Sequence, residues 1–420
     1  MRSFFLGALV VGLAGLVAAG EGSLGVGEEF FLRVDGLGKG IQATPDAAWG
    51  DGLYLAVWRE GWHGKGGRAR IHAARLSPDG KVLDPGGIEI APCNEGVQER
   101  PRVAFGGGVF LVVWQDLRNG KDYDVLAARV SREGKVLDAE PLTVAAAPRT
   151  QALPAVASDG NGFLVAWQGL SGDETAYRGF AAPVSADGKV AAAVETGATP
   201  QPMLAWGGNG YLAAYGGQTV FSVMLSPQGQ PLNPAKWGNP AIRSTKEAAF
   251  SVSAVPGKGW LVVGHRSPPD PWGWGGPGAM RAAFINSDGT LGNQDALKEP
   301  AGNWARLPGW LDLGKEKTTG ATWPWGPSAS AWGGRHSLVV WQRHHLGGEK
   351  MTRFENCDVI AARVDGFASL DPAGVPVAAS AADELRPALA SDGRGRLLCV
   401  YEKREEDAAP RVAARMLTVP

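Results

Sequence analysis

Aromatic and imidazole side chains that could bind a ligand gather in one part of the chain. The histidines of this group are His265, His344 and His345. Its tryptophans lie in connections rich in Gly and Pro, at Trp272, Trp274, Trp304, Trp310, Trp323 and Trp325. Exposed indole rings can stack on sugar rings or capture a peptide. The alternative is that these tryptophans anchor long connections to the core, and both interpretations predict the same composition.

The segment that begins with His344 and His345 is also rich in groups that bind metals, because it contains Glu349, Glu355, Cys357 and Asp358. Adjacent side chains point in different directions in an extended chain, and no pair has the spacing of a zinc site. We therefore expect a surface loop without a metal, and we expect no cofactor.

A second group of oxygen ligands lies at Asp116, Asn119, Asp122 and Asp124 and suggests a calcium loop. The order of these residues differs from that of an EF-hand. We instead expect Asp116 and Asp124 to accept hydrogen bonds from neighbouring arginines or from backbone N–H groups.

Signatures of the common enzyme classes, such as G-x-S-x-G, H-E-x-x-H and the Walker loop, do not occur. A glycosidase needs two carboxyl groups held about 5–10 Å apart. Acidic residues that could line one face of the fold are Glu60, Glu174, Glu355 and Glu402. They belong to different repeats, so the sequence selects no pair and the catalytic residues stay unknown.

The chain repeats one pattern of short strands, and this pattern must position the candidate residues. Pro101 precedes Trp114 by thirteen residues, and the same interval separates Pro45 from Trp58. A period of about 50 residues built from short strands is typical of a β-propeller. We predict an all-β fold, namely a seven-bladed β-propeller of four-stranded antiparallel blades.

The two ends of the chain indicate how the ring closes. The last repeat stops near Leu417, after its third strand. An apolar segment at residues 31–34 matches the fourth strand of the other repeats. We predict that this N-terminal strand completes the last blade, which would remove the open sheet edges.

The repeats share three motifs. The clearest copies are WQDLR at residues 114–118 and DVLAARV at residues 124–130, with turns such as Asp79-Gly80-Lys81. The repeats resemble a widespread group of secreted bacterial propeller proteins that carry W-[QE]-D-x-R, D-[IV]-x-A-x-R-V and D-G-x-x-L. The resemblance covers essentially the whole chain after residue 20. It implies a propeller fold and an exported location, and no established common activity.

Connections on one face differ greatly in length. Long insertions are expected around residues 265–280, 291–327 and 342–358. Variable loops on a rigid scaffold are the usual place for binding sites. Our leading hypothesis is an exported, non-enzymatic propeller that binds a polysaccharide or a protein through the loop face of blades five and six. The alternative is a polysaccharide-active hydrolase or lyase that uses acidic residues near the central channel.

The N-terminus and the composition bound the location of the protein. Residues 1–20 have a basic start, an apolar run and small residues at the end, as in a signal peptide. Residues 21–420 would then form a single propeller that is periplasmic, on the cell surface or extracellular. The net charge of −1 provides no field that attracts nucleic acid or anionic lipid. We expect a monomer without a membrane span, in which Cys93 and Cys357 could form a disulfide.

Overall fold

The fold was analysed in a computed structural model. It describes residues 22–34, 40–62, 67–92, 96–170, 176–197, 201–215, 221–232, 251–266, 279–290, 292, 311–312, 322–323, 328–347, 353–366 and 368–420. The predicted signal peptide at residues 1–20 lies outside this part of the chain. Every named element in the described part is a β-strand. No described segment is a helix long and apolar enough to cross a membrane.

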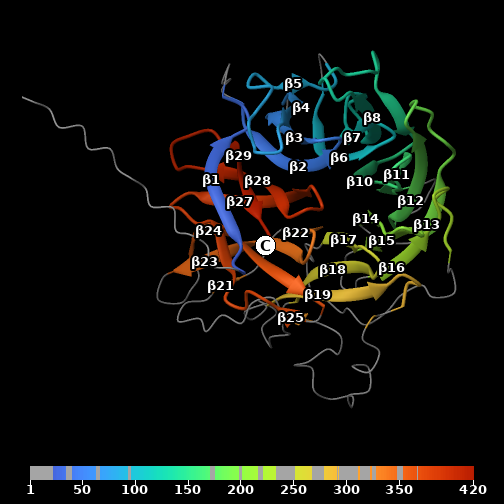
Figure 1. Ribbon diagram of the computed structural model, residues 1–420. Helices are drawn as coiled ribbons and strands as arrows, with labels where there is room; N and C mark the ends of the chain where they lie inside the picture. Colours follow the sequence, from blue (N-terminus) through green and yellow to red (C-terminus); the bar gives the residue numbers. More distant parts are fainter. Residues whose placement is uncertain are drawn as a thin grey trace, which may run out of the picture.

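Seven small antiparallel sheets stand around a centre, and this arrangement confirms the predicted seven-bladed β-propeller (Figure 1). Blade one contains β2 (Gln42–Gly50), β3 (Leu53–Gly61), β4 (Ala69–Leu76) and β5 (Ile88–Glu89). Blade two contains β6 (Gln98–Gly106), β7 (Val109–Asp116), β8 (Asp124–Val130) and β9 (Leu142–Ala145). Blade three contains β10 (Gln151–Ser158), β11 (Gly162–Gly169), β12 (Arg178–Ser185) and β13 (Val194–Gly197).

The remaining blades are less regular. Blade four contains, within the described residues, β14 (Pro202–Trp206), β15 (Tyr211–Tyr215) and β16 (Phe221–Leu225). Blade five contains β17 (Ser251–Val255), β18 (Gly259–Arg266), β19 (Ala279–Asn286) and β20 (Leu311–Asp312). Blade six contains β21 (Thr322–Trp323), β22 (Ser328–Trp332), β23 (Ser337–Gly347), β24 (Arg353–Asp365), β25 (Ala368–Ser369) and β26 (Val375–Ala378).

Blade seven joins the two ends of the chain. It contains β27 (Asp383–Ser391), β28 (Arg396–Arg404) and β29 (Arg411–Thr418), and β1 (Gly25–Phe31) pairs with β29 (Figure 1). The predicted closure by an N-terminal strand is therefore confirmed. The position of the strand differs from the prediction of residues 31–34, because β1 ends at Phe31. Its ladder runs from Gly25, which pairs with Thr418, to Phe31, which pairs with Ala413.

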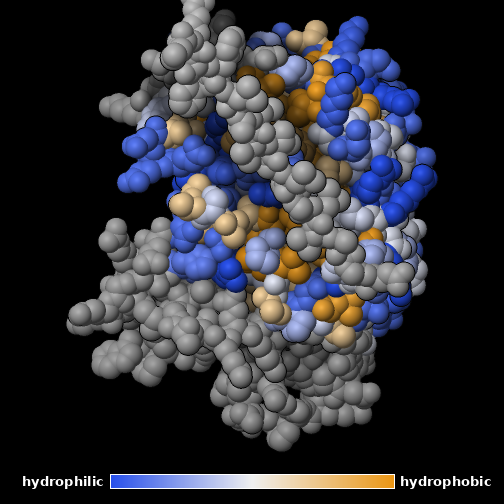
Figure 2. Space-filling view, turned by 60° about the vertical axis from the view of Figure 1, so that its left-hand side comes forward, coloured by the Kyte–Doolittle hydropathy of each residue, from blue (hydrophilic) through white to orange (hydrophobic). Residues whose placement is uncertain are grey.

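Apolar strands pack face to face between neighbouring blades. The second strands are buried along most of their length, and Trp58, Trp114 and Trp167 within them, with Trp260 at the start of β18, are fully enclosed. Burial of such large apolar side chains from both sides stabilises the stacked sheets. The face of the molecule in Figure 2 carries many hydrophilic residues, with hydrophobic ones between them.

Arginines of the third strands hold the outer edge of the blades. Arg75 pairs with Asp84 at 2.8 Å, and Arg129 pairs with Asp138 at 2.7 Å. Arg75 also donates to the backbone carbonyl of Arg132 in the next blade, at 3.1 Å. These arginines recur at the same position of the repeat, so they belong to the architecture of the blades.

Candidate functional site

A cavity of about 540 Å³ occupies the central channel. Residues of all seven innermost strands line it, from β2, β6, β10, β14, β17, β22 and β27. Most of these residues lie where the innermost strands begin. This is the end of the channel beside the connections between second and third strands. Charged residues reach the cavity from blades seven, one and two, whereas blades five and six contribute neutral residues such as Ser251, Ser328 and Ser330.

A repeated bulge shapes the wall of this cavity. In four blades the register of the innermost strand shifts around an X-Pro dipeptide, for example between Ala43 and Asp46. The residues before proline have a left-handed backbone with φ of 50–57°, and we call them the bulge residues: Thr44, Arg100, Leu153, Gln201 and Arg386. This backbone is uncommon for residues other than glycine, and bulges of this kind redirect side chains near functional sites.

A side-chain oxygen from the preceding blade holds most bulge residues in place. We call the residue that follows the second-strand aromatic the junction residue: Arg59, Gln115, Gln168, Gln342 and Glu402. The N–H of Thr44 donates to Oε1 of Glu402 at 2.8 Å, and that of Leu153 donates to Oε1 of Gln115 at 3.0 Å. The other two bonds of this kind, from Gln201 to Gln168 and from Arg386 to Gln342, measure 3.1 Å each.

Arg59 is the exception among the junction residues. A guanidinium group has no acceptor, so Arg59 cannot accept the bond that Gln and Glu accept in the other junctions. Only 6% of Arg59 is exposed, and among the described residues its Nε has no hydrogen-bond partner. Nη1 of Arg59 lies 3.7 Å from Oε1 of Glu99. Burial lowers the pKa of Arg59, and Arg386 and Arg404 act in the same direction.

Asp46 and Glu99 are the acidic residues of the cavity wall within the described part of the chain. Burial raises the pKa of Asp46, although Arg102 and the N–H of Val103, which donates to Oδ2 at 3.0 Å, act in the opposite direction. Glu99 accepts hydrogen bonds from Tyr123 at 2.8 Å and from Gln115 at 3.2 Å. The two carboxyl groups therefore stand in different electrostatic surroundings.

Arginines outnumber the carboxylates around the cavity. They are Arg59, Arg100, Arg102, Arg386 and Arg404. The buried Glu402 accepts hydrogen bonds from Arg386 at 2.8 and 2.9 Å and from Arg404 at 2.8 Å. Burial also lowers the pKa of Arg100, and Arg102 and Arg386 lower it further. This part of the channel is therefore an electropositive pocket with two carboxyl groups in its wall.

Most of the binding residues predicted from the sequence lie outside the described residues. These are Trp272, Trp274, Trp304, Trp310 and Trp325. Trp323 belongs to β21 and His265 to β18, but the description does not extend to their side chains. Among the other tryptophans of this region, Trp260 and Trp341 are buried and Trp332 is partly buried.

His344 and His345 are described, and their side chains diverge. Nε2 of His344 lies 2.6 Å from Nε2 of Gln342, and Nδ1 of His344 lies 3.4 Å from the sulfur of Cys357. His345 contacts Asp358 at 2.6 Å. Both lie in paired strands, because β23 and β24 extend through much of the segment expected to be a loop. The contacts of His344 with Cys357 and of His345 with Asp358 join β23 to β24.

Cys357 is buried as a free thiol, and burial raises its pKa to about 12. The structure thus does not hold it in the predicted disulfide with Cys93, which lies outside the described residues. Within the described part of the chain, no group of three or more His, Cys, Asp or Glu side chains is placed to hold a metal ion.

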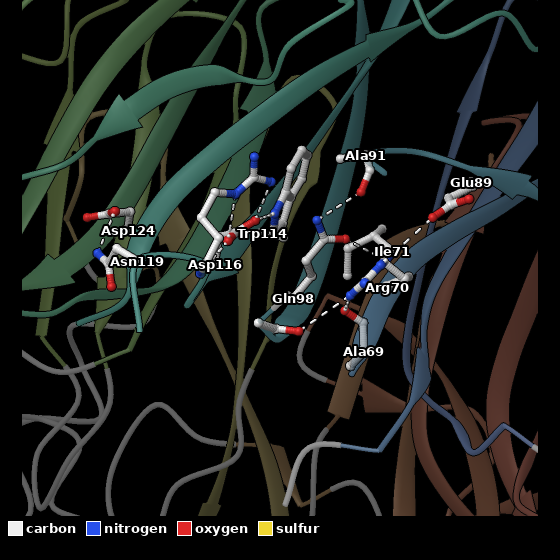
Figure 3. Close-up of polar contacts among 12 residues, drawn as sticks. Ala69, Arg70, Ile71, Glu89, Ala91, Gln98, Trp114, Asp116, Asn119 and Asp124 are labelled. Atoms are coloured by element: carbon white, nitrogen blue, oxygen red, sulfur yellow. Dashed lines mark hydrogen bonds and ion pairs between the residues drawn. The ribbon is translucent and has the colours of Figure 1, made fainter. Parts of the chain in front are cut away.

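Other acidic residues named from the sequence have structural partners. Asp116 accepts hydrogen bonds from Trp114 and Arg118 at 2.8 Å each, and Asp124 accepts one from Asn119 at 3.0 Å (Figure 3). Glu60 accepts a hydrogen bond from Trp58 at 3.2 Å. Glu174 and the side chain of Glu355 lie outside the described part of the structure. Glu402 accepts hydrogen bonds from Thr44 and from the arginines of blade seven.

Sequence reasoning missed Asp46, Glu99 and Arg59. One signal was available at the position after the proline, where the sequence has Asp46 and Arg102 in the first two repeats and Ala155 in the third. A second signal was the junction position itself, where Arg59 replaces the Gln or Glu of the W-[QE] motif. Both deviations from the repeat, the charged residues after the proline and Arg59 at the junction position, lie in blades that supply charged side chains to the channel.

No protein-family model and no curated protein matches the chain. Among solved structures, a protein of unknown function from Dyadobacter fermentans is similar, with 10% identity, a TM-score of 0.49, and coverage of 94% of this chain and 99% of that one. The catalytic domain of a GH62 α-L-arabinofuranosidase from Coprinopsis cinerea shares 10% identity at a TM-score of 0.41, with coverage of 94% and 97%. A GH43_1 enzyme from Xanthomonas citri, complexed with xylose, shares 14% identity at a TM-score of 0.39, with coverage of 63% and 93%.

These comparisons correct the leading hypothesis from the sequence. The GH43 and GH62 structures among them are glycoside hydrolases, and not non-enzymatic binding proteins. The leading hypothesis of a non-enzymatic propeller that binds through blades five and six is corrected accordingly, and the alternative of a hydrolase or lyase is taken up below as a proposal. At such low identity no activity transfers to this chain, so the reaction must be argued from its own residues.

Proposed function

We propose that this protein is a polysaccharide-active hydrolase or lyase whose acidic residues act in the central channel. The observation that carries the proposal is the placement of Asp46 and Glu99 in one cavity with different surroundings. Carboxyl groups whose environments differ in this way can divide the roles of acid and base between them. The cavity volume of about 540 Å³ lies in the usual range for small-molecule sites.

Asp46 is the proton donor of the proposed reaction. Because burial raises its pKa, its protonated form persists to higher pH than that of an exposed aspartate. A protonated carboxyl group can donate to the oxygen of a glycosidic bond as that bond breaks. The N–H of Val103 donates to Oδ2 of this carboxyl group and orients it in the wall of the channel.

Glu99 is the base. Its Oε2 is fixed by Tyr123 and Gln115, and its Oε1 lies on the side of Arg59. In a hydrolase it would activate water or attack the sugar, and in a lyase it would remove a proton next to a carboxylate of the substrate. The products distinguish the two reactions, since only a lyase leaves an unsaturated sugar end.

The proposal is tested with a panel of neutral and acidic oligosaccharides. The wild-type protein is expected to shorten at least one of them, as followed by chromatography and by the ultraviolet absorbance of unsaturated ends. The variants Asp46→Asn and Glu99→Gln are expected to lose about 10²- to 10⁴-fold in rate, the usual contribution of a general acid or base. Glu140→Gln removes an exposed carboxylate and serves as the matched control.

Two results would reject the proposal. One is that the folded wild-type protein cleaves no saccharide of the panel. The other is that both variants cleave at the rate of the Glu140→Gln control.

We also propose that the chain is exported and that residues 1–20 are removed. The composition of those residues and the resemblance of the repeats to secreted propeller proteins support this location. Mass spectrometry of the protein from whole cells and from the exported fraction tests it, because a mature chain that still begins at Met1 would contradict removal.

A further inference from the structure

The junction between blades one and two lacks the side-chain oxygen that completes the other described junctions. In those junctions Gln115, Gln168, Gln342 or Glu402 accepts a hydrogen bond from the bulge residue of the next blade. Arg59 occupies the same position and offers only donors. An oxygen that accepts the N–H of Arg100 at this junction must therefore come from a group other than a junction residue.

The junction between blades seven and one shows what kind of oxygen fits. There the carboxylate of Glu402 accepts hydrogen bonds from the N–H of Thr44 and from the guanidinium groups of Arg386 and Arg404. A carboxylate can accept several donors at once, and it pairs with planar guanidinium groups. The junction beside Arg59 has similar donors, namely the bulge residue Arg100 and the Arg59 side chain, but among the described residues no hydrogen bond links a carboxylate to both of them.

The charge around Arg59 favours an anion. Glu99 is the only carboxylate that an ion pair assigns to Arg59 in the described residues, and at 3.7 Å it is a distant one. The Nε of Arg59 is enclosed and lacks a hydrogen-bond partner there. A buried donor without a partner is destabilising, more so when it is charged, so a bound acceptor would stabilise this arrangement.

The geometry points to a carboxylate of an acidic saccharide, a uronate unit, as the group that Arg59 binds in the central channel, with Arg100 beside it. This inference rests on the proposed function and names its substrate class. A uronate presents a planar carboxylate on a sugar ring, which suits bidentate pairing with arginine better than a neutral pentose or hexose does.

The variant Arg59→Gln separates binding from folding. It introduces the residue found at three other junctions, so the introduced amide can accept the N–H of Arg100 and the fold is expected to be at least as stable as that of the wild type. The same change removes the donor proposed for the ligand. Binding of a galacturonate oligosaccharide, measured by calorimetry, is expected to weaken about 10- to 100-fold.

The controls identify the chemistry of the ligand. The methyl-esterified oligosaccharide has the same sugar rings without the charge, and it is expected to bind the wild type as weakly as the acid form binds Arg59→Gln. A sulfated oligosaccharide supplies negative charge without a planar carboxylate. Arg132→Gln removes an exposed arginine and is expected to bind the galacturonate oligosaccharide as the wild type does.

The outcomes separate this inference from the proposed function. Equal binding of the acid and methyl-esterified forms, or unchanged binding by a folded Arg59→Gln variant, would overturn the inference. Tighter binding of the sulfated form than of the galacturonate would overturn it as well. Binding of the galacturonate form that depends on Arg59, without cleavage of any saccharide, would support the inference and reject the proposed function.

Discussion

Asp46 shows how a single residue acquires a chemical role from its position in the repeat. It follows the X-Pro dipeptide of β2, where the bulge directs it toward the channel and toward β6 of the next blade. The corresponding residue in blade three, Ala155, is apolar. Burial of the carboxyl group stabilises its neutral form, and this explains the direction of its pKa shift.

The pH dependence of the proposed reaction follows from this shift. Asp46 must be protonated to act as the acid, so kcat/KM is expected to fall as the pH rises through a pKa above the ordinary value of 3.8. The residual activity of Asp46→Asn should lack this decline, whereas Glu140→Gln should retain it. A pH-rate profile of the three proteins tests this. An identical decline in Asp46→Asn would assign it to another group.

The same shift also affects stability, with a defined sign. The folded state holds the proton of Asp46 more tightly than the unfolded state does, so this contribution to stability is complete at low pH and is lost as the pH rises through the folded pKa. Asp46→Asn should therefore be at least as stable as the wild type at neutral pH, since an amide oxygen can still accept the N–H of Val103. Urea unfolding at neutral pH measures the difference.

The innermost strands and the junction residues form the element that positions the site. Gln168 is a suitable test of a junction, because its Oε1 accepts the N–H of Gln201 and it lies away from the charged side of the channel. Gln168→Met keeps the length of the side chain and removes the acceptor. The expected loss is about 1–3 kcal/mol in the free energy of unfolding, the cost of a buried N–H without its partner.

Chemical denaturation of Gln168→Met beside an exposed control measures this loss. Gln228→Met lies in an outer turn and is expected to change the stability by less than about 0.5 kcal/mol. If both variants unfold at the same denaturant concentration, the junction bonds do not contribute measurably to the stability of the ring.

The elements of this fold could be predicted from the sequence much better than its site. The repeats predict the blades because Trp58 and Trp114 recur with their prolines at a fixed interval. The site depends on deviations from that pattern, and their meaning is geometric. Arg59 follows Trp58 as Gln115 follows Trp114, but only the structure shows that this position contacts the bulge of the next blade.

The same limit applies to the carboxyl groups. Of the carboxylates that the sequence suggests for the loop face, Glu60 accepts a hydrogen bond from the Trp58 indole and Glu402 accepts hydrogen bonds from arginines. Asp46 and Glu99 come instead from innermost strands of adjacent blades, and their proximity to one cavity is a property of the closed ring. A sequence periodicity does not show which side chains face the axis of such a ring.

At the scale of the whole molecule, the channel exists only because the ring is closed. Strand β1 pairs with β29 along most of its length, and Glu29 accepts hydrogen bonds from Tyr401 and Lys403 of β28 at 2.5 Å each. Blade seven supplies Arg386, Arg404 and the buried Glu402 to the charged side of the cavity. A weakened blade seven would therefore disturb the site as well as the fold.

Removal of β1 tests this coupling. A chain that begins at Arg33 lacks β1 and the fully buried Leu32, whereas a chain that begins at Gly22 keeps both and serves as the control. Loss of Leu32 alone is expected to cost about 2–5 kcal/mol, and the exposed edge of β29 can pair with other chains. The shorter chain should unfold at lower temperature and form oligomers, as measured by calorimetry and size-exclusion chromatography. A monomer that melts with the control would show that three strands suffice to complete blade seven, and that the site does not depend on closure by β1.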